Sequence, residues 1–341
     1  MSEAYRDAGV DVAGADRFVA SIGDAVAATW GGRVVGGFGG FATGIRMPPG
    51  YERPVLMMTT DGVGTKAEVA RIAGKLDGLG WDLVAMCVDD LAAAGARPLA
   101  LTDYLAVGRL DPEVAGALVR SVAAACSAAG CALLGGETAE HPGVMERDRF
   151  DLAGAAVGIV EEGSEVTGAA IADGDRIVAV SSPNLRANGF SLIRTLVLPR
   201  LGLDEEFPGT AHTVTDVMLE PSVIYAPAVM TALEAGPVHG LAHVTGGGIA
   251  GNLRRVLPAG LHATVDTATW DPPPVFAGVA RIGGIGRDDM FATFNMGVGF
   301  LAVVPPAAAA DVITAFAAGG HDAWVAGSVG PGARGVTLAG L

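Results

Sequence analysis

The apolar and polar positions in the first half of the chain predict alternating strands and helices. Residues 111–130 have helical periodicity, with Asp111 as N-cap, Pro112 in the first turn and Gly130 as C-cap. A second helix is expected within 78–98. Short apolar runs predict strands over 54–60, 98–108, 131–136 and 152–162.

The second half shows a similar alternation after a polar stretch, "EEGSEVTGA", over 162–170. This stretch predicts a boundary between two domains, 1–167 and 168–341. Both halves are therefore expected to be α/β or α+β domains. The expected strands cover 175–182, 240–245, 299–304 and 322–327, and the expected helices cover 187–200, 219–235 and 307–318.

The composition fits a packed protein and limits its partners. Half of the 341 residues are hydrophobic, which argues against disorder, yet no apolar stretch approaches the roughly 20 residues of a membrane span. The net charge of −15 repels nucleic acids and anionic membranes, so phosphates would be bound locally by glycine amides, metal ions and a few cations. The polar N-terminus is not expected to be a signal peptide, and Cys87, Cys126 and Cys131 are expected to be free thiols in the cytosol.

The segment "TTDGVGTK" places phosphate chemistry at the end of a predicted strand. The strand delivers Asp61, while Gly62 and Gly64 let backbone N–H groups approach a ligand and Lys66 adds a positive charge. Such a set suits a nucleotide triphosphate with Mg²⁺, although Ala67 follows the lysine, so this is not a Walker A loop. A charged turn without function remains the alternative.

Several carboxylates recur near strand ends and in apolar surroundings. Asp89 and Asp90 interrupt a strongly apolar stretch, and buried carboxylates are costly unless they are paired or bind a metal. Glu137 follows a strand and two glycines, and Asp103 and Asp151 repeat this pattern more weakly. These acids predict a magnesium site, because Mg²⁺ prefers oxygen ligands. At least one acid of the 89–90 pair could instead face solvent.

The glycine-rich segment "HVTGGGIAGN" has two interpretations. Gly246, Gly248 and Gly251 match a dinucleotide fingerprint, with Asp266 at the expected distance. Pro258, however, limits the following helix to about two turns, which favours a helix N-terminus that binds a substrate phosphate. His243 precedes the glycines and is either a structural histidine or a residue that donates to a phosphate or moves protons.

Together these segments resemble the phosphoribosylformylglycinamidine cyclo-ligase (aminoimidazole ribonucleotide synthetase) family. The resemblance runs nearly from end to end. It is carried by "YRDAGVDVAGAD", "GGFGGF", "TTDGVGTK", "WDLVAMCVDDL", "GARPLALTDYLAVGRLD", "GCALLGGETAEHPG", "DLAGAAVGIVE", "ANGFSLIR", "HVTGGGIAGNLRRVLP" and "TFNMGVG".

The resemblance implies a cytoplasmic homodimer with two domains per subunit. An N-terminal sheet domain would bind ATP and dimerise, followed by a C-terminal α/β domain. The implied reaction converts formylglycinamidine ribonucleotide and ATP into aminoimidazole ribonucleotide, ADP and phosphate, in purine biosynthesis. ATP would phosphorylate the amide oxygen and the amidine nitrogen would then close the ring, with Mg²⁺ stabilising the phosphoryl charge.

The resemblance also implies roles for individual residues. The carboxylates of Asp61, Asp90 and Glu137 would lie on the magnesium side, and Lys66, Asp90, Asn188 and His243 would be the catalytic group. The expected nucleotide and phosphate contacts are Gly37, Gly39 and Gly40 in a mobile cover at 36–41, Asp61, Gly62, Gly64, Thr65, Lys66, Gly136, Glu137, and Gly246, Gly247 and Gly248.

Two positions depart from the family pattern. Ala27 and Ala28 stand where the family usually has a lysine pair, and Arg186 and Ala187 stand where it usually has His-Ser. The alternatives are therefore a divergent paralogue that uses ATP to phosphorylate a different amide or related oxygen, or a non-catalytic nucleotide-binding protein.

Overall fold

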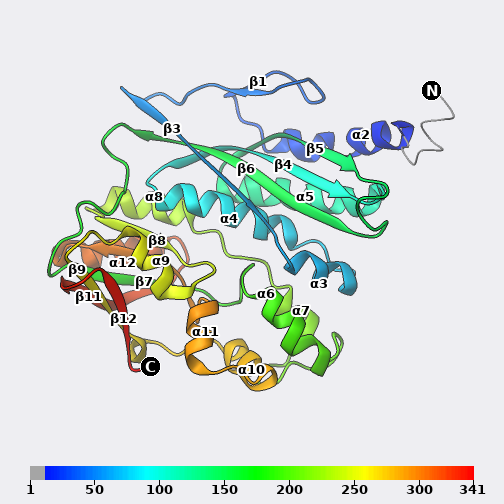
Figure 1. The fold of residues 1–341 in the computed structure, drawn as a ribbon. Helices are drawn as coiled ribbons and strands as arrows, with labels where there is room; N and C mark the ends of the chain where they lie inside the picture. Colours follow the sequence, from blue (N-terminus) through cyan, green and yellow to red (C-terminus); the bar gives the residue numbers. More distant parts are fainter. Residues whose placement is uncertain (1–11) are drawn as a thin grey trace. The chain divides into compact units, whose positions relative to one another are not determined.

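The computed structural model describes residues 12–341, which form two compact units (Figure 1). The first unit comprises the described residues up to Leu91 together with Pro98–Glu161, and the second comprises Ala92–Arg97 and Glu162–Leu341. Each unit holds its own sheet, which confirms the α/β class.

The first unit is built on a four-stranded sheet in the order β3-β6-β4-β5. The first pair of strands is antiparallel and the pair β4 and β5 is parallel. All four strands were expected from the apolar runs. Their bounds are β3 Pro54–Gly62, β4 Arg97–Val107, β5 Ala132–Glu140 and β6 Phe150–Glu161.

Helices cover one face of this sheet. Helices α4 (Leu79–Ala93) and α5 (Pro112–Ala129) lie along it, and α2 (Val12–Ala28) packs on α5 (Figure 1). Asp111 accepts hydrogen bonds from the N–H groups of Glu113 and Val114, and Gly130 closes the helix in the left-handed conformation, which confirms both predicted caps.

The opposite face of the sheet is partly open. A two-stranded ribbon, β1 (Val34–Val35) and β2 (Gly44–Ile45), brings Ile45 against the core residue Ile159. Leu56, Met58 and Tyr104 are nevertheless 53%, 76% and 43% exposed. This face therefore presents apolar side chains to the solvent.

The second unit contains a mixed six-stranded sheet in the order β12-β9-β11-β7-β10-β8. Helix α8 (Ala226–Ala235) packs on α12 (Ala309–Ala318), which contacts β7 and β11, while α9 (Gly248–Val256) contacts both edge strands. The strands are β7 Arg176–Ser181, β8 Gly240–His243, β9 Leu261–Asp266, β10 Val298–Val304, β11 Ala323–Pro331 and β12 Gly335–Ala339.

Two helix predictions in this unit were wrong in part. Of the expected helix over 219–235, only the part from Ala226 onward is helical, as α8, because Pro221 lies in the non-helical part and Pro227 stands in the first turn of α8. Helix α7 (Val214–Met218) ends before this range and was not predicted. The expected helix over 187–200 begins as α6 (Phe190–Leu192) and continues as a π-turn and a 3₁₀-turn to Arg200. Strands β9 and β12 and helices α3 (Lys66–Ala73), α10 (Pro274–Gly283) and α11 (Arg287–Thr293) were not predicted.

Candidate active site

The predicted phosphate segment connects β3 to α3. Asp61 is the last residue but one of β3, and its Oδ1 accepts a hydrogen bond of 2.7 Å from the N–H of Gly62. Gly64 adopts φ +64°, a conformation that side chains disfavour, and Thr65 occupies the N-cap position of α3. Gly64 therefore has a backbone reason that is independent of any ligand.

Lys66 is buried instead of reaching into solvent. Its side chain is 1% exposed, and its Nζ lies 2.8 Å from both carboxylate oxygens of Asp82 on α4, which is 0% exposed. An ion pair this deep is costly to break from either side. Asp82 was not predicted as a partner, although it stands in the same apolar stretch as Asp89 and Asp90.

Asp61 and Asp90 come from different elements, and the charges of both act on Cys87. Asp61 comes from β3 and the half-buried Asp90 from α4. Both lie near the Cys87 thiol: burial is the main cause that raises the pKa of Cys87 to about 12, and the negative charges of Asp61 and Asp90 raise it further. Two of the three carboxylates that were predicted to face magnesium therefore lie in the surroundings of the same thiol.

Glu137 lies elsewhere. It pairs with Tyr104 in the β4–β5 register and therefore shares the open face of the sheet with that side chain, whereas Asp61 faces the helix-covered side. Three strand spacings, about 14 Å, also separate β3 from β5. One ion with ligand bonds of about 2.1 Å cannot contact both carboxylates in one chain. Among residues 12–341, no group of three or more His, Cys, Asp or Glu side chains is arranged to hold a metal ion.

The absence of a side chain at Gly136 leaves room for the buried carboxyl of Asp103. A Cβ atom at this position would lie 2.2 Å from Oδ1 of Asp103, its partner in β4. Asp103 is 7% exposed, and burial raises its pKa to about 7. A side chain at position 136 would therefore displace the Asp103 carboxyl.

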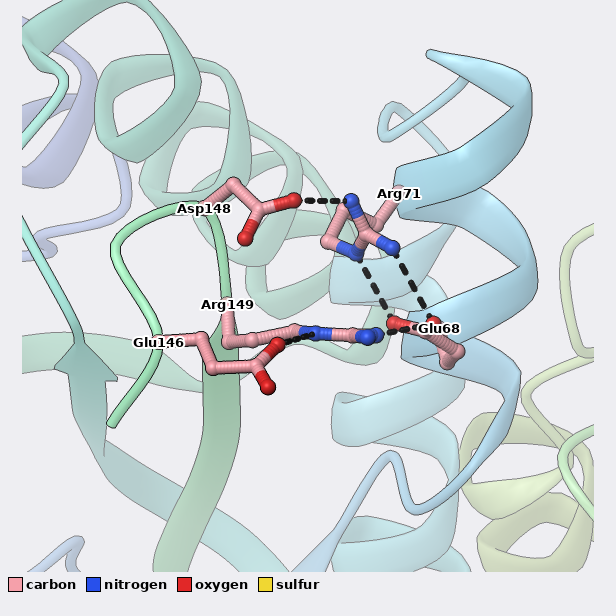
Figure 2. A network of polar contacts seen from close by, with 5 residues as sticks. All are labelled: Glu68, Arg71, Glu146, Asp148 and Arg149. Atoms are coloured by element: carbon pink, nitrogen blue, oxygen red, sulfur yellow. Dashed lines mark hydrogen bonds and ion pairs between the residues drawn. The ribbon is translucent and has the colours of Figure 1, made fainter. Parts of the chain in front are cut away.

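An ion-pair network anchors α3, the helix that follows the phosphate segment (Figure 2). The Nε and Nη2 atoms of Arg71 donate to the two Glu68 oxygens at 2.8 and 3.1 Å, and Nη1 of Arg71 contacts Asp148 at 2.6 Å. Arg149 also pairs with Glu68, and its Nε donates to Glu146 at 3.0 Å. The network therefore ties α3 to the loop between β5 and β6. The hydrogen bond from Arg71 is the main cause that lowers the pKa of Glu68 to about 2.

We expect Glu68→Gln to reduce the free energy of unfolding by about 3 kcal/mol at pH 7, since the pKa of Glu68 falls from 4.5 to about 2 and each pKa unit corresponds to about 1.4 kcal/mol. The Glu68 pKa is lowered in the folded state from 4.5 to about 2, so its stabilisation is present above pH 4.5 and is lost as the pH falls towards 2. Urea unfolding over this pH range measures the difference. Glu113→Gln, at an exposed position of α5, is the control, and a pH-independent difference for Glu68→Gln would contradict the prediction.

The glycine loop of the second unit is joined to Asn188. Oδ1 of Asn188 accepts a hydrogen bond of 3.0 Å from the N–H of Gly246. Gly247 caps α9 at φ +94°, and a Cβ at Gly248 would lie 1.9 Å from the carbonyl oxygen of Phe291. The structure therefore brings two predicted substrate-side residues together, and close packing explains the third glycine.

His243 ends β8 beside this loop and contacts Arg186. Nη1 of Arg186 lies 2.7 Å from Nε2 of His243, and the imidazole stacks on Phe300 with ring centroids 5.9 Å apart. Arg186 is 0% exposed and has φ +57°. The arginine that departs from the family pattern therefore contacts the histidine that was predicted to act.

The dinucleotide interpretation fails on topology. A dinucleotide fold needs β8, α9 and β9 to form a βαβ unit with neighbouring parallel strands. Here β8 pairs only with β10 at one edge of the sheet, and β9 lies four positions away. The glycines of 246–251 therefore open a helix but do not form a dinucleotide fingerprint.

The predicted cover at 36–41 lies between β1 and β2 in the first unit. Gly39 has φ +84°, and no heavy atom lies within 4 Å of a Cβ built on Gly37 or Gly39. Phe41, at the end of the segment, is fully exposed. Phe38 of the same segment is half-buried and lies beside Gly23 of α2, so the segment is packed at this side chain and open at Gly37, Gly39 and Phe41.

Comparison with known proteins decides the family. The chain matches the AIR synthase related protein N-terminal domain over residues 45–160 and the corresponding C-terminal domain over 172–339. A phosphoribosylformylglycinamidine cyclo-ligase of Anaeromyxobacter dehalogenans (strain 2CP-1) is 45% identical over 337 residues, which are 98% of each chain. The chain belongs to the phosphoribosylformylglycinamidine cyclo-ligase family. A relative of the same name from Myxococcus xanthus is 44% identical over 335 residues, or 97% of each chain.

Solved structures of related fold support the cyclo-ligase architecture. Thiamine-monophosphate kinase from Stenotrophomonas maltophilia aligns with a TM-score of 0.69 at 20% identity, covering 94% of this chain and 96% of the kinase. The hydrogenase maturation protein HypE in complex with ATP aligns with a TM-score of 0.65 at 20% identity, covering 94% and 88%. These TM-scores, over 94% of this chain, establish a shared fold.

Proposed function

We propose that this cyclo-ligase converts formylglycinamidine ribonucleotide to aminoimidazole ribonucleotide with ATP, as an enzyme of purine biosynthesis. The observation that carries the proposal is the 45% identity to a named cyclo-ligase across 98% of both chains. A relationship that spans both domains includes the phosphate segment, the carboxylates and the glycine loop. The complex of HypE with ATP supports a nucleotide site on this fold.

The chemistry requires activation of a poor leaving group. An amide oxygen does not leave readily, so ATP first transfers its terminal phosphoryl group to that oxygen. The neighbouring amidine nitrogen then attacks the same carbon, the ring closes and phosphate departs. Phosphoryl transfer depends mainly on positioning and on charge stabilisation, which the N–H groups around Gly62 and Gly64 can supply.

Magnesium is proposed at Asp61 and Asp90. Both carboxylates lie in the surroundings of Cys87, and two such oxygen donors suit Mg²⁺ with phosphates and water as further ligands. The ion would neutralise phosphate charge when bound. Glu137 is assigned to a separate position on the open face of the sheet, where it would contact the nucleotide or a second ion. Thr65 and the 36–41 segment are proposed to contact or cover ATP.

Lys66, Asn188 and His243 keep proposed roles of different kinds. Lys66 is buried against Asp82. It would therefore act on phosphates through its charge and by holding the phosphate segment in position, as well as by direct contact. Asn188 and His243, with Gly246, Gly247 and Gly248, are proposed to bind the substrate side.

A homodimer is proposed through the open face of the first sheet. Leu56, Met58 and Tyr104 present apolar surface there, and exposed apolar patches of this kind mark association sites. Light scattering of the purified chain tests this: a mass of one chain contradicts it.

We further propose domain limits of 1–167 and 168–341 and a cytoplasmic location. Within residues 12–341, no helix has both the length and the apolar character needed to cross a bilayer.

The function is tested by phosphate release from MgATP with and without formylglycinamidine ribonucleotide. We expect substrate-dependent release together with a product that carries the aminoimidazole chromophore. ATP binding without this turnover would contradict the assignment and would favour a paralogue with another substrate.

A further inference from the structure

The contact between Arg186 and His243 fixes where the imidazole carries its proton. Every guanidinium nitrogen of arginine is a donor, and the group stays protonated in proteins. Because Nη1 of Arg186 lies 2.7 Å from Nε2 of His243, Nε2 must be the acceptor of this hydrogen bond. A neutral imidazole that accepts at Nε2 carries its hydrogen on Nδ1.

Arg186 is held in place from several sides. Its Nη2 donates to the carbonyl oxygen of Val223 at 3.1 Å, and its guanidinium lies 5.0 Å from the ring centroid of Tyr225. Its backbone N–H donates to Oδ1 of Asn184 at 3.0 Å, which supports a left-handed conformation that is rare for a side chain of this size. The arginine is therefore fixed before any substrate binds.

His243 is equally constrained, and it adjoins the proposed substrate loop. It pairs with Phe300 in the β8–β10 register, and the two rings stack at an interplanar angle of 19°. The chain reaches Gly246 three residues later, where the N–H is bound by Asn188. One short segment thus supplies both Arg186, which binds His243, and Asn188, which binds the loop.

We propose that Arg186 is a positioning residue that holds His243 as the Nδ1–H tautomer, so that His243 donates a hydrogen bond through Nδ1 and does not act as a base through Nε2. The donor role rests on the proposed function, whereas the tautomer does not.

The tautomer is measured directly by two-bond ¹H–¹⁵N correlation on the full chain labelled with ¹⁵N-histidine. The His243 signals are assigned as those that disappear in His243→Asn. We expect a neutral ring with hydrogen on Nδ1 in the wild-type protein, and a shift towards the Nε2–H form in Arg186→Met. Arg194→Met, at an exposed position of the same unit, is the matched control and should leave the spectrum unchanged. A wild-type ring protonated on Nε2 would overturn the proposal, whether or not Arg186→Met folds.

Two substitutions at His243 separate a donor at Nδ1 from a base at Nε2. The amide nitrogen of Asn can occupy the Nδ1 position, whereas the amide of Gln occupies the Nε2 position. We therefore expect His243→Gln to lose about 100-fold in kcat and His243→Asn to lose about tenfold. The reverse order would overturn the donor role. If the wild-type chain does not turn over formylglycinamidine ribonucleotide, the proposed function fails, while the NMR result still decides the tautomer.

Discussion

Asp90→Asn is expected to lower kcat/KM for substrate-dependent ATP turnover by about 100- to 1,000-fold. Asp90 and Asp61 both act on the Cys87 thiol through their charge, and they are the pair of carboxylates to which we assign Mg²⁺. The substitution removes one metal-binding charge while it nearly preserves the side-chain volume. Phosphate release at varied Mg²⁺ concentration measures the loss, and part of it should be recovered at high Mg²⁺.

The control for this experiment is Asp24→Asn, at an exposed position of α2 in the same unit. It removes the same charge from the protein surface and should leave kcat/KM within about twofold, because an exposed charge is screened by solvent. Circular dichroism and the urea midpoint establish that the Asp90 variant is folded. Unchanged turnover in a folded Asp90→Asn protein would refute the magnesium assignment.

Lys66→Met is expected to reduce the free energy of unfolding by about 3–5 kcal/mol. Lys66 and Asp82 are 1% and 0% exposed, so loss of the lysine leaves a carboxylate in a buried site without its main counter-charge. The double variant Lys66→Met/Asp82→Leu should regain a large part of the loss, because both charges are then replaced by apolar side chains. Urea unfolding measures all three proteins.

Arg33→Met provides the control for removal of a positive charge at an exposed position, and it should change stability by less than about 0.5 kcal/mol. If the double variant is no more stable than Lys66→Met, the ion pair is not the source of the effect. Measuring ATP turnover by the double variant tests whether Lys66 also acts on the phosphates. A stable double variant with full activity would remove Lys66 from the catalytic group.

Local sequence patterns were sufficient to predict much of the secondary structure of the first unit. Asp111, Pro112 and Gly130 mark the ends of α5, because caps depend on hydrogen bonds within a few residues. The four strands of its sheet were also predicted from their apolar runs. In the second unit, β9 and β12 were missed, since short strands with half-exposed side chains carry a weak periodic signal.

The sequence by itself determined the family, the α/β class and which residue types gather near strand ends. Only the tertiary structure decided which of those residues meet. Glu137 lies on the other face from Asp61 because strand order and register, which form over long sequence separations, set the face of every side chain. Lys66 finds Asp82 and Arg186 finds His243 for a related reason: a buried charge or donor needs a partner, and packing of distant segments supplies it.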